Sequence, residues 1–305
     1  MARLVFLGTP EAGVLPLRTL VDAGHDVALV VTRADKRRGR GSALVASPVK
    51  AAATGLGIAV TDSLTDVPGA GAELGVVVAY GRIIPAELLD RVPMVNLHFS
   101  LLPRWRGAAP VERAILEGDA ETGVCLMAVE AGLDTGGIYA EEATVIGEEE
   151  TADELRSRLV DIGCGLLVEH LANGRAGLPP ARDQVGTPSY AEKVVASEHQ
   201  LRWHQPAVQL HRVVRLGRAW TTFRGRRLGI VRATVSGTGT GTDSDDRRVT
   251  SGTGDGAGSL EGTHALAGDG YRLTLVTVQP EGKRPMEAEA WLRGVRPERG
   301  ERLGG

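Results

Sequence analysis

The sequence has few aromatic residues and very little cysteine. Only 4% of its 305 residues are Phe, Trp or Tyr, and Cys125 and Cys164 are its two cysteines. Both lie among apolar residues and lack the spacing of a zinc site. We therefore interpret them as core residues of a protein from a reducing compartment rather than as a disulfide or a metal site.

Long apolar runs are missing as well. No run approaches the roughly 18 residues that a membrane-spanning helix needs. The apolar burst after Met1 ends at Pro10 and Glu11, too early for a secretory signal, so it predicts a first strand. The pattern GxGxxG does not follow this strand, which argues against a dinucleotide cofactor. We expect a cytoplasmic protein without a membrane segment.

Length and charge suggest two domains of different character. A chain of 305 residues can bury two cores, and 42% hydrophobic and 24% charged residues are typical of a globular protein. Residues 1–205 carry 19 Lys and Arg against 27 Asp and Glu, whereas residues 206–305 carry 16 against 11. The C-terminal part is therefore basic enough to contact a polyanion, although mild basicity is also common in other proteins.

The first part of the chain alternates between strand and helix patterns. Short apolar runs predict the strands, and helical spacing or a proline start predicts the helices. The strands are expected at 4–8, 27–32, 74–79 and 92–98, and the helices at 14–21, at 47–56 and from 85 onward. The alternation predicts an α/β domain with a Rossmann-like, largely parallel sheet and function at the carboxyl ends of its strands.

A long helix is expected to close this domain, because residues 151–154 match a capping box and apolar residues then recur at helical spacing. We place the first domain at residues 1–189, a linker at 190–205 and a second domain at 206–305. Short strand patterns predict a small β-barrel of the OB type in the second domain, at 220–223, 227–235, 264–267, 271–278 and 286–292. Residues 236–262, dense in Gly, Ser, Thr and Asp, are expected to form a disordered insertion.

One short segment carries the polar residues of most interest. Asn96 and His98 are two positions apart on a predicted strand, so their side chains point to the same side. Pro103 ends regular structure after them, and Asp134 lies in a glycine-bounded loop. An amide, an imidazole and a carboxylate that converge would suit catalysis, whereas either strand residue alone is more often a hydrogen-bonded structural residue.

Residues 96–110 and 132–136 together resemble the signature of the 10-formyltetrahydrofolate-dependent formyltransferases. The portion 100–110, the Gly-Thr-Pro-Glu opening at 8–11 and the segments 190–193 and 279–286 are similar to the members of that family that act on methionyl-tRNA. The resemblance implies transfer of the formyl group of 10-formyltetrahydrofolate to the amino group of initiator methionyl-tRNA, for translation initiation. We expect no metal in this reaction and, by default, a monomer.

The resemblance also implies roles for single residues. Asn96 would donate amide hydrogens to the oxyanion of the tetrahedral intermediate, His98 would contact that oxyanion and transfer protons, and Asp134 would be the partner of the imidazole. An apolar pocket with backbone polar groups suits a pterin, and the matching folate-binding segment is Ser100, Leu101, Leu102 and Pro103. Residues 78–82 resemble another wall of that pocket, but a Val-rich strand followed by Gly is also common without such a role.

A basic loop follows the second predicted strand. Its five cations are Arg33, Lys36, Arg37, Arg38 and Arg40. So many cations repel one another unless they are solvated or bound to phosphates, and composition alone leaves both possibilities open. In the members of the family that act on methionyl-tRNA this loop enters the acceptor end of initiator tRNA, so the resemblance implies tRNA binding by Arg40, at the matching position of the key arginine, with Arg38 and Arg37 beside it.

Two alternatives and two departures limit this interpretation. The three catalytic residues would equally serve a formyltransferase for a small amine, such as an amino sugar or glycinamide ribonucleotide, and an RNA-binding protein could keep the fold without catalysis. The basic loop and the basic second domain favour tRNA. The chain departs from the family at Leu201-Arg202-Trp203, where an Asp usually precedes the Trp, and at the shortened segment 216–220. Both departures leave the prediction of formyl transfer intact and concern only how the second domain docks on tRNA.

Overall fold

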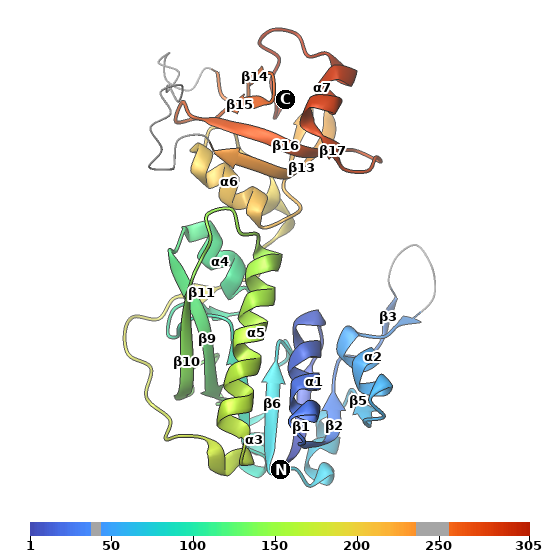
Figure 1. The fold of residues 1–305 in the computed structure, drawn as a ribbon, viewed down its shortest axis with the longest axis vertical. Helices are drawn as coiled ribbons and strands as arrows, with labels where there is room; N and C mark the ends of the chain where they lie inside the picture. Colours follow the sequence, from blue (N-terminus) through green and yellow to red (C-terminus); the bar gives the residue numbers. More distant parts are fainter. Residues whose placement is uncertain (38–43, 236–255) are drawn as a thin grey trace. The chain divides into compact units, whose positions relative to one another are not determined.

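The computed structural model describes residues 1–37, 44–235 and 256–305 and divides them into two compact units (Figure 1). Unit 1 consists of Met1–Arg113, Ala120–Ile146 and Glu154–Lys193, and unit 2 of Ala114–Asp119, Gly147–Asp153 and Val194–Gly305. Arg38, Arg40 and most of the predicted insertion lie outside the described residues.

Unit 1 is built on a seven-stranded sheet with the order β10-β9-β7-β6-β1-β2-β5. Its five parallel strands are β1 (Arg3–Gly8), β2 (Asp26–Val31), β5 (Val60–Thr61), β6 (Leu74–Val78) and β7 (Met94–His98). Two antiparallel strands, β9 (Glu121–Ala128) and β10 (Ile138–Val145), extend the sheet beyond β7. The α/β class with a largely parallel sheet is therefore confirmed.

The helices of unit 1 connect and cover these strands. They are η1 (Glu11–Gly13), α1 (Val14–Asp22), α2 (Pro48–Gly55), η2 (Leu64–Ala70), α3 (Ala86–Arg91), α4 (Pro110–Glu117, whose second half belongs to unit 2), α5 (Ala152–Leu171) and η3 (Gly174–Gly177). Ser47 caps α2, because its Oγ accepts a hydrogen bond from the Lys50 N–H. Figure 1 shows the long α5 beside the sheet, and Gly163 of this helix closely approaches Leu97 of β7.

The core of unit 1 lies along the central strands. Every residue of β6 is buried, as expected for a parallel strand covered on both faces. The chain runs from β1 to β2 on one side and returns to β6 on the other, so β1 and β6 flank the point where the strand order reverses. In such sheets, ligands bind outside the carboxyl ends of the strands near this point. His98 is the last residue of β7, the strand next to β6.

Two short ladders complete unit 1. The strands β3 (Lys36–Arg37) and β4 (Leu44–Val45) pair as a hairpin on the two sides of residues 38–43. The strand β8 (Arg106–Gly107) pairs in parallel with β11 (Tyr190–Ala191). This second ladder brings the end of unit 1 back to the segment that follows β7.

Unit 2 contains an antiparallel sheet with the order β12-β13-β16-β15-β14, and β17 also pairs with β16. The strands are β12 (Trp220–Phe223), β13 (Arg226–Val235), β14 (Leu260–Glu261), β15 (His264–Leu266), β16 (Arg272–Pro280) and β17 (Met286–Glu287). Three helices accompany them: η4 (Ala196–His199), α6 (Ala207–Arg215) and α7 (Ala288–Val295). A separate β-sheet domain in the C-terminal part is thus confirmed.

The structure corrects three expectations for this unit. Residues 286–292 are not one strand, since β17 ends at Glu287 and α7 follows; Ala288 and Trp291 are buried at helical spacing. Residues 201 and 203, expected in a linker, pack into the core of unit 2. The predicted disordered insertion ends too late, because Leu260 lies in β14 and is buried. Along the described part of the chain, no helix has the length and apolar character that crossing a membrane requires.

Candidate active site

The end of β7 carries two of the predicted site residues. Asn96 pairs in register with Val77 of β6, and His98 pairs with Cys125 of β9. His98 is buried and Asn96 is half-buried. Because the two residues are separated by one position on an extended strand, both side chains lie on the same face of the sheet.

The imidazole of His98 is bound on one side and faces a carboxylate on the other. Its Nε2 lies 2.9 Å from the carbonyl oxygen of Trp105. A carbonyl can only accept, so Nε2 carries a hydrogen and donates it. Its Nδ1 lies 3.6 Å from Oδ2 of Asp134. The structure therefore brings the predicted imidazole and carboxylate together.

Burial lowers the pKa of His98, because the charged imidazolium loses its solvation, while Asp134 and the Trp105 carbonyl raise it to a smaller extent. The neutral ring is thus favoured near neutral pH. With Nε2–H directed to Trp105, the lone pair of Nδ1 faces the carboxylate of Asp134. The two groups can take up one proton between them, as a proton-transfer site requires.

Asp134 is held by the backbone of the segment that follows β7. Its Oδ2 accepts a hydrogen bond of 2.7 Å from the Gly107 N–H. Gly107 has a φ of +122°, and a Cβ atom there would lie 2.9 Å from the carbonyl oxygen of Ala191. Only glycine fits this position without strain. Asp134 itself adopts a left-handed φ of +50°, which Asp tolerates better than most residues.

The four residues predicted to line a folate site form the turn after β7. Ser100, Leu102 and Pro103 are buried, and Leu101 is half-buried. The Ser100 hydroxyl donates to the carbonyl of Arg104 at 2.5 Å, and the Leu102 N–H donates to Sγ of Cys125 at 3.4 Å. Burial raises the pKa of Cys125 to about 12, so its thiol stays protonated and packs as a core group. These contacts shape the turn beside His98.

Gln184 and Arg106 are parts of the site that the sequence interpretation missed. The Gln184 amide donates to the carbonyls of Asp134 and Gly136 and accepts from the Arg106 guanidinium. Gln184 lies 50 positions from Asp134 in an irregular segment. No local pattern marks it, since its partners are brought near only by the fold.

The segment 78–82 and the basic loop also lie at the carboxyl ends of parallel strands. Tyr80 is buried just after β6, and burial raises the pKa of its hydroxyl. At the base of the basic loop, the Lys50 ammonium lies 2.8 Å from the Asp35 carboxylate. Arg37 lies on β3, whereas Arg38 and Arg40 are outside the described residues.

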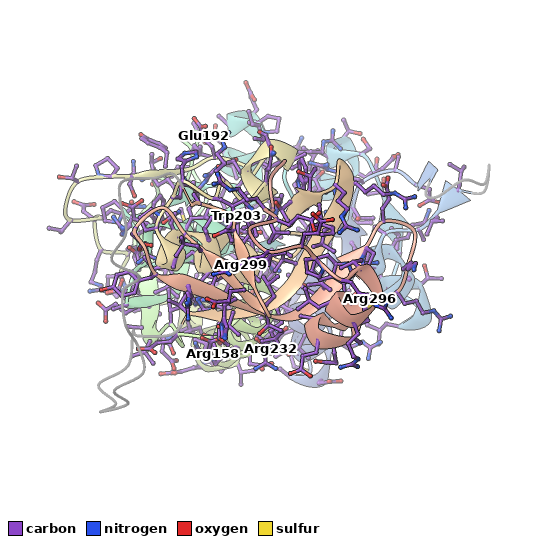
Figure 2. The ribbon with its side chains drawn as sticks, turned by 90° about the horizontal axis from the view of Figure 1, so that it is seen from above. Arg158, Glu192, Trp203, Arg232, Arg296 and Arg299 are labelled. Carbon is purple, nitrogen blue, oxygen red and sulfur yellow. The ribbon has the colours of Figure 1, made fainter. Side chains whose placement is uncertain are left out.

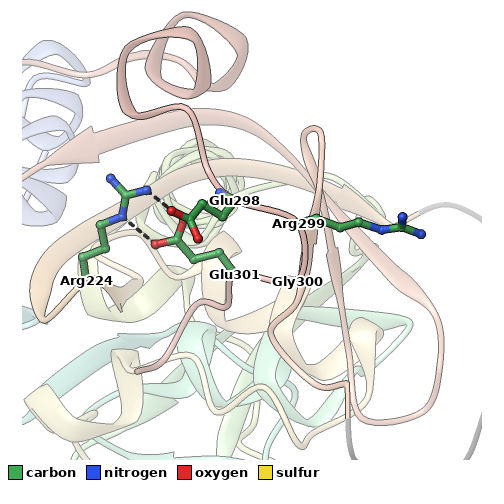
Figure 3. A pocket seen from close by; sticks show the side chains of 5 residues that line it. All are labelled: Arg224, Glu298, Arg299, Gly300 and Glu301. Atoms are coloured by element: carbon green, nitrogen blue, oxygen red, sulfur yellow. Dashed lines mark hydrogen bonds and ion pairs between the residues drawn. The ribbon is translucent and has the colours of Figure 1, made fainter.

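The arginines of unit 2 are spread over several elements. Figure 2 labels Arg232 on β13, Arg296 directly after α7 and Arg299 in the C-terminal segment, all three exposed. Figure 3 shows an open pocket of about 510 Å³ lined by Arg224, Glu298, Arg299, Gly300 and Glu301. Arg224 is paired with Glu301 there, and the Arg299 side chain points away from that pair. This pocket contains none of the predicted site residues.

Nowhere among the described residues do three or more His, Cys, Asp or Glu side chains gather as a group that could hold a metal ion.

Two family models match the chain. The model described as formyl transferase matches residues 2–171, and the model described as formyl transferase, C-terminal domain, matches residues 193–296. Curated relatives named methionyl-tRNA formyltransferase match nearly the full length. The protein from Dinoroseobacter shibae is 40% identical, with 96% of this chain and 97% of that protein covered, and the protein from Methylobacterium sp. strain 4-46 is 41% identical, with 99% of both covered.

Solved structures share the fold at low identity. An N-formyltransferase from Helicobacter canadensis, in complex with folinic acid and dTDP-3-aminofucose, matches with a TM-score of 0.68 at 18% identity, over 92% of this chain and 100% of that one. A methionyl-tRNA formyltransferase from Clostridium thermocellum matches with a TM-score of 0.57 at 16% identity, over 77% and 93% of the two chains. The two family models and the identity of about 40% over nearly the full length show that this chain belongs to the formyl transferase family.

Proposed function

We propose that the chain transfers the formyl group of 10-formyltetrahydrofolate to the free amino group of initiator methionyl-tRNA and so produces N-formylmethionyl-tRNA for translation initiation. The full-length similarity to methionyl-tRNA formyltransferases supports the substrates. The single structural observation that supports the chemistry is the buried His98, 3.6 Å from the Asp134 carboxylate at the end of β7.

The reaction needs one oxyanion site and one place for a proton. The neutral amine attacks the formyl carbon, and the formyl oxygen becomes an oxyanion in the tetrahedral intermediate. The bond from this carbon to the folate nitrogen then breaks. The amine loses one proton and the departing folate nitrogen gains one, so the protein has to move a proton without consuming any.

The side chains at β7 are assigned to these two needs. Asn96 donates its amide hydrogens to the oxyanion, as a neutral donor does in other acyl-transfer sites. His98, neutral near pH 7, accepts the amine proton at Nδ1 and returns it to the folate nitrogen, with Asp134 stabilising the imidazolium between these steps. If His98 is also to contact the oxyanion, its Nε2–H has to leave the carbonyl of Trp105 and donate to the oxyanion instead.

The remaining assignments concern binding. The folate lies against the turn formed by Ser100, Leu101, Leu102 and Pro103, with residues 78–82 as a second wall. Initiator tRNA contacts Arg40, Arg38 and Arg37 and the basic C-terminal residues 206–305. Residues 1–189 form the catalytic domain of an enzyme that acts as a monomer in the cytoplasm, and no metal takes part.

The test is a direct formylation assay. Purified protein, 10-formyltetrahydrofolate and charged initiator methionyl-tRNA are mixed, and N-formylmethionine is measured after deacylation. Separate reactions offer an amino sugar nucleotide and glycinamide ribonucleotide in place of the tRNA. Formylation of methionyl-tRNA supports the proposal, whereas formylation of a small amine alone refutes the tRNA assignment.

A second test concerns the basic loop. Arg40→Ala removes one cation from a predicted phosphate contact, so kcat/KM for methionyl-tRNA should fall by about tenfold while KM for 10-formyltetrahydrofolate changes by less than about twofold. Arg18→Ala, at an exposed arginine of α1, is the control for loss of one positive charge. Equal losses for both substrates would contradict a role of Arg40 in tRNA binding.

A further inference from the structure

Residues 182–191 form a segment that is fixed to the candidate active site at both ends. At one end, Arg182 and Ile138 exchange two backbone hydrogen bonds of 2.8 Å. At the other, β11 pairs with β8, and the Arg106 N–H donates to the carbonyl of Ser189 at 2.9 Å. The segment lies between the two regions that the family models match, which end at residue 171 and begin at residue 193. Gln184 lies close to its first end, two positions after Arg182.

The carboxamide of Gln184 is fully used inside the protein. Its Nε2 donates to the carbonyl oxygens of Asp134, at 2.8 Å, and Gly136, at 2.9 Å. Its Oε1 accepts two hydrogen bonds from the Arg106 guanidinium, at 3.1 and 2.6 Å. A side-chain amide offers two donor hydrogens and one acceptor oxygen with two lone pairs, so all four positions are occupied. Gln184 is half-buried, whereas its neighbours Asp183 and Val185 are exposed.

Together with a backbone contact of Gly107, these hydrogen bonds form a closed network that includes the Asp134 carboxylate. Gln184 binds the backbone of Asp134 on one side and the side chain of Arg106 on the other. Gly107, the next residue after Arg106, donates its N–H to Oδ2 of Asp134. The backbone and the carboxylate of Asp134 are therefore held from two directions that meet at β8. This matters because Nδ1 of His98 and Oδ2 of Asp134 are 3.6 Å apart, which is longer than a hydrogen bond, so the distance between them depends on the groups that hold Asp134.

We infer that Gln184 is a positioning residue, which sets the distance between the Asp134 carboxylate and the His98 ring by holding the carbonyls of Asp134 and Gly136 and the guanidinium of Arg106. As a contribution to catalysis this inference rests on the proposed formyl transfer; as a structural statement about His98 and Asp134 it stands without it. Gln184 acts through Asp134 and is not assigned any contact with a substrate.

Two variants test the hydrogen bonds of the carboxamide, one by removing all of them and one by removing only its N–H donors. Gln184→Ala removes all four hydrogen bonds. Gln184→Glu keeps the size of the side chain and an oxygen for Arg106 but has no N–H for the two carbonyls, so it remains informative if the alanine variant does not fold. Both should lower kcat by about tenfold to a hundredfold with KM for either substrate changed less than about threefold, since a misplaced catalytic group costs turnover more than binding.

Two matched controls accompany them. Val185→Ala changes an exposed neighbour on the same segment. Gln279→Ala removes a similar glutamine side chain that donates to a carbonyl, that of Lys283 at 3.0 Å, in unit 2. Both should keep kcat within about twofold of the original protein. A Gln184 variant that behaves like these controls overturns the inference.

The readout that does not depend on activity is the titration of His98, followed by NMR of histidine-labelled protein. The Asp134 carboxylate raises the pKa of His98, so releasing it should move the His98 midpoint to lower pH by about half a unit or more in Gln184→Ala. Gln184→Glu is compared by its kcat alone, because its added carboxylate itself raises the pKa of a nearby histidine. If the original protein formylates nothing, the proposed function fails but this shift still tests the positioning. If formylation is normal in the original protein and the His98 midpoint does not move in Gln184→Ala, the positioning role is refuted.

Discussion

The two units each contain a buried histidine that faces a carboxylate, and the two pairs have similar geometry. His98 Nδ1 lies 3.6 Å from Asp134, and His211 Nε2 of α6 lies 3.3 Å from Glu149. Each ring also bonds to a backbone carbonyl, that of Trp105 or of Ala233. Burial is the main cause that lowers the pKa of both histidines, and the carboxylate raises it in both. A lowered histidine pKa in this protein is therefore not by itself a sign of catalysis.

The surroundings of the carboxylates distinguish the pairs. The Asp134 side chain is 17% exposed and is held by Gly107, whereas the Glu149 side chain is 51% exposed on the loop before α5. Two arginines of α6 fix the neighbourhood of Glu149 through backbone carbonyls, because Arg215 donates to Gly147 and Glu150 and Arg212 donates to Glu117. The first pair is placed at the carboxyl end of a parallel strand, and the second attaches the loop before α5 to α6 inside unit 2.

The largest expected difference between the pairs follows removal of each imidazole. His98→Ala should lower kcat for formylation about a hundredfold or more, because it removes the group that we propose as the carrier of the proton. Asn96→Ala should have an effect of the same order through the oxyanion. His211→Ala should keep kcat within about threefold but lower the melting temperature, since it leaves a cavity and removes the contact with Glu149. Steady-state kinetics and thermal melts of all three variants check this, and near-normal turnover of His98→Ala would refute its assignment.

Neutralising the two carboxylates should give the next largest difference. Asp134→Asn retains an oxygen for the Gly107 N–H but can turn its NH₂ toward Nδ1 of His98, which would occupy the lone pair that accepts the proton. We expect kcat to fall by about a hundredfold. Glu149→Gln is the matched control and should keep kcat within about twofold. A comparable loss in both variants would mean that the two pairs do not differ in function.

Candidate site residues could be proposed from the sequence where a strand pattern or the family resemblance marks them. Asn96 and His98 are placed by strand alternation, and Asp134 by the family resemblance, so all three could be proposed before the fold was known. Gln184 and the carbonyl of Trp105 could not, because a glutamine amide and a backbone oxygen gain their roles only from contacts made by the folded chain. His211 was missed for the same reason, since Glu149 lies 62 positions away.

The fold was predictable to a similar degree. The strands of the parallel sheet are short apolar runs, which can be recognised in the sequence without knowledge of the tertiary structure. The prediction of a single strand at 286–292 is wrong for a local reason. Met286 and Glu287 do form a strand, but the apolar residues that follow are too few to distinguish the spacing of a helix from the alternation of a strand. The partners of Leu201 and Trp203 in the core of unit 2 lie far along the chain, so those residues resembled a linker.

Acid should lower the stability of the fold through both histidines at once. Burial lowers the pKa of both histidines in the folded protein below the value of about 6.5 that they have in the unfolded chain. Above about pH 6.5 both states are neutral, so the histidines do not reduce the stability of the fold. As the pH falls below about 6.5, the unfolded chain binds protons first, and the free energy of unfolding decreases until the folded pKa is reached. The denaturant midpoint should therefore drop between about pH 7.5 and pH 5.5. His211→Gln should reduce the drop, because its amide does not titrate. Denaturation curves at the two pH values test this, and an undiminished drop in the variant would show that His211 does not contribute.

The smallest effect is expected for an ion pair without a buried histidine. Arg224 donates to both carboxylate oxygens of Glu301 in the open pocket of unit 2, and 48% of the Arg224 side chain is exposed (Figure 3). The pairing lowers the pKa of Glu301, but solvent screens such a pair and its net contribution to stability is small. Glu301→Gln should leave turnover and melting temperature unchanged within error, because the amide oxygen still accepts from Arg224. A clear loss of methionyl-tRNA turnover at unchanged melting temperature would instead assign this pocket to substrate binding. The contrast between the buried pair of His98 and Asp134, for which we propose catalysis, and the other ion pairs would then no longer hold.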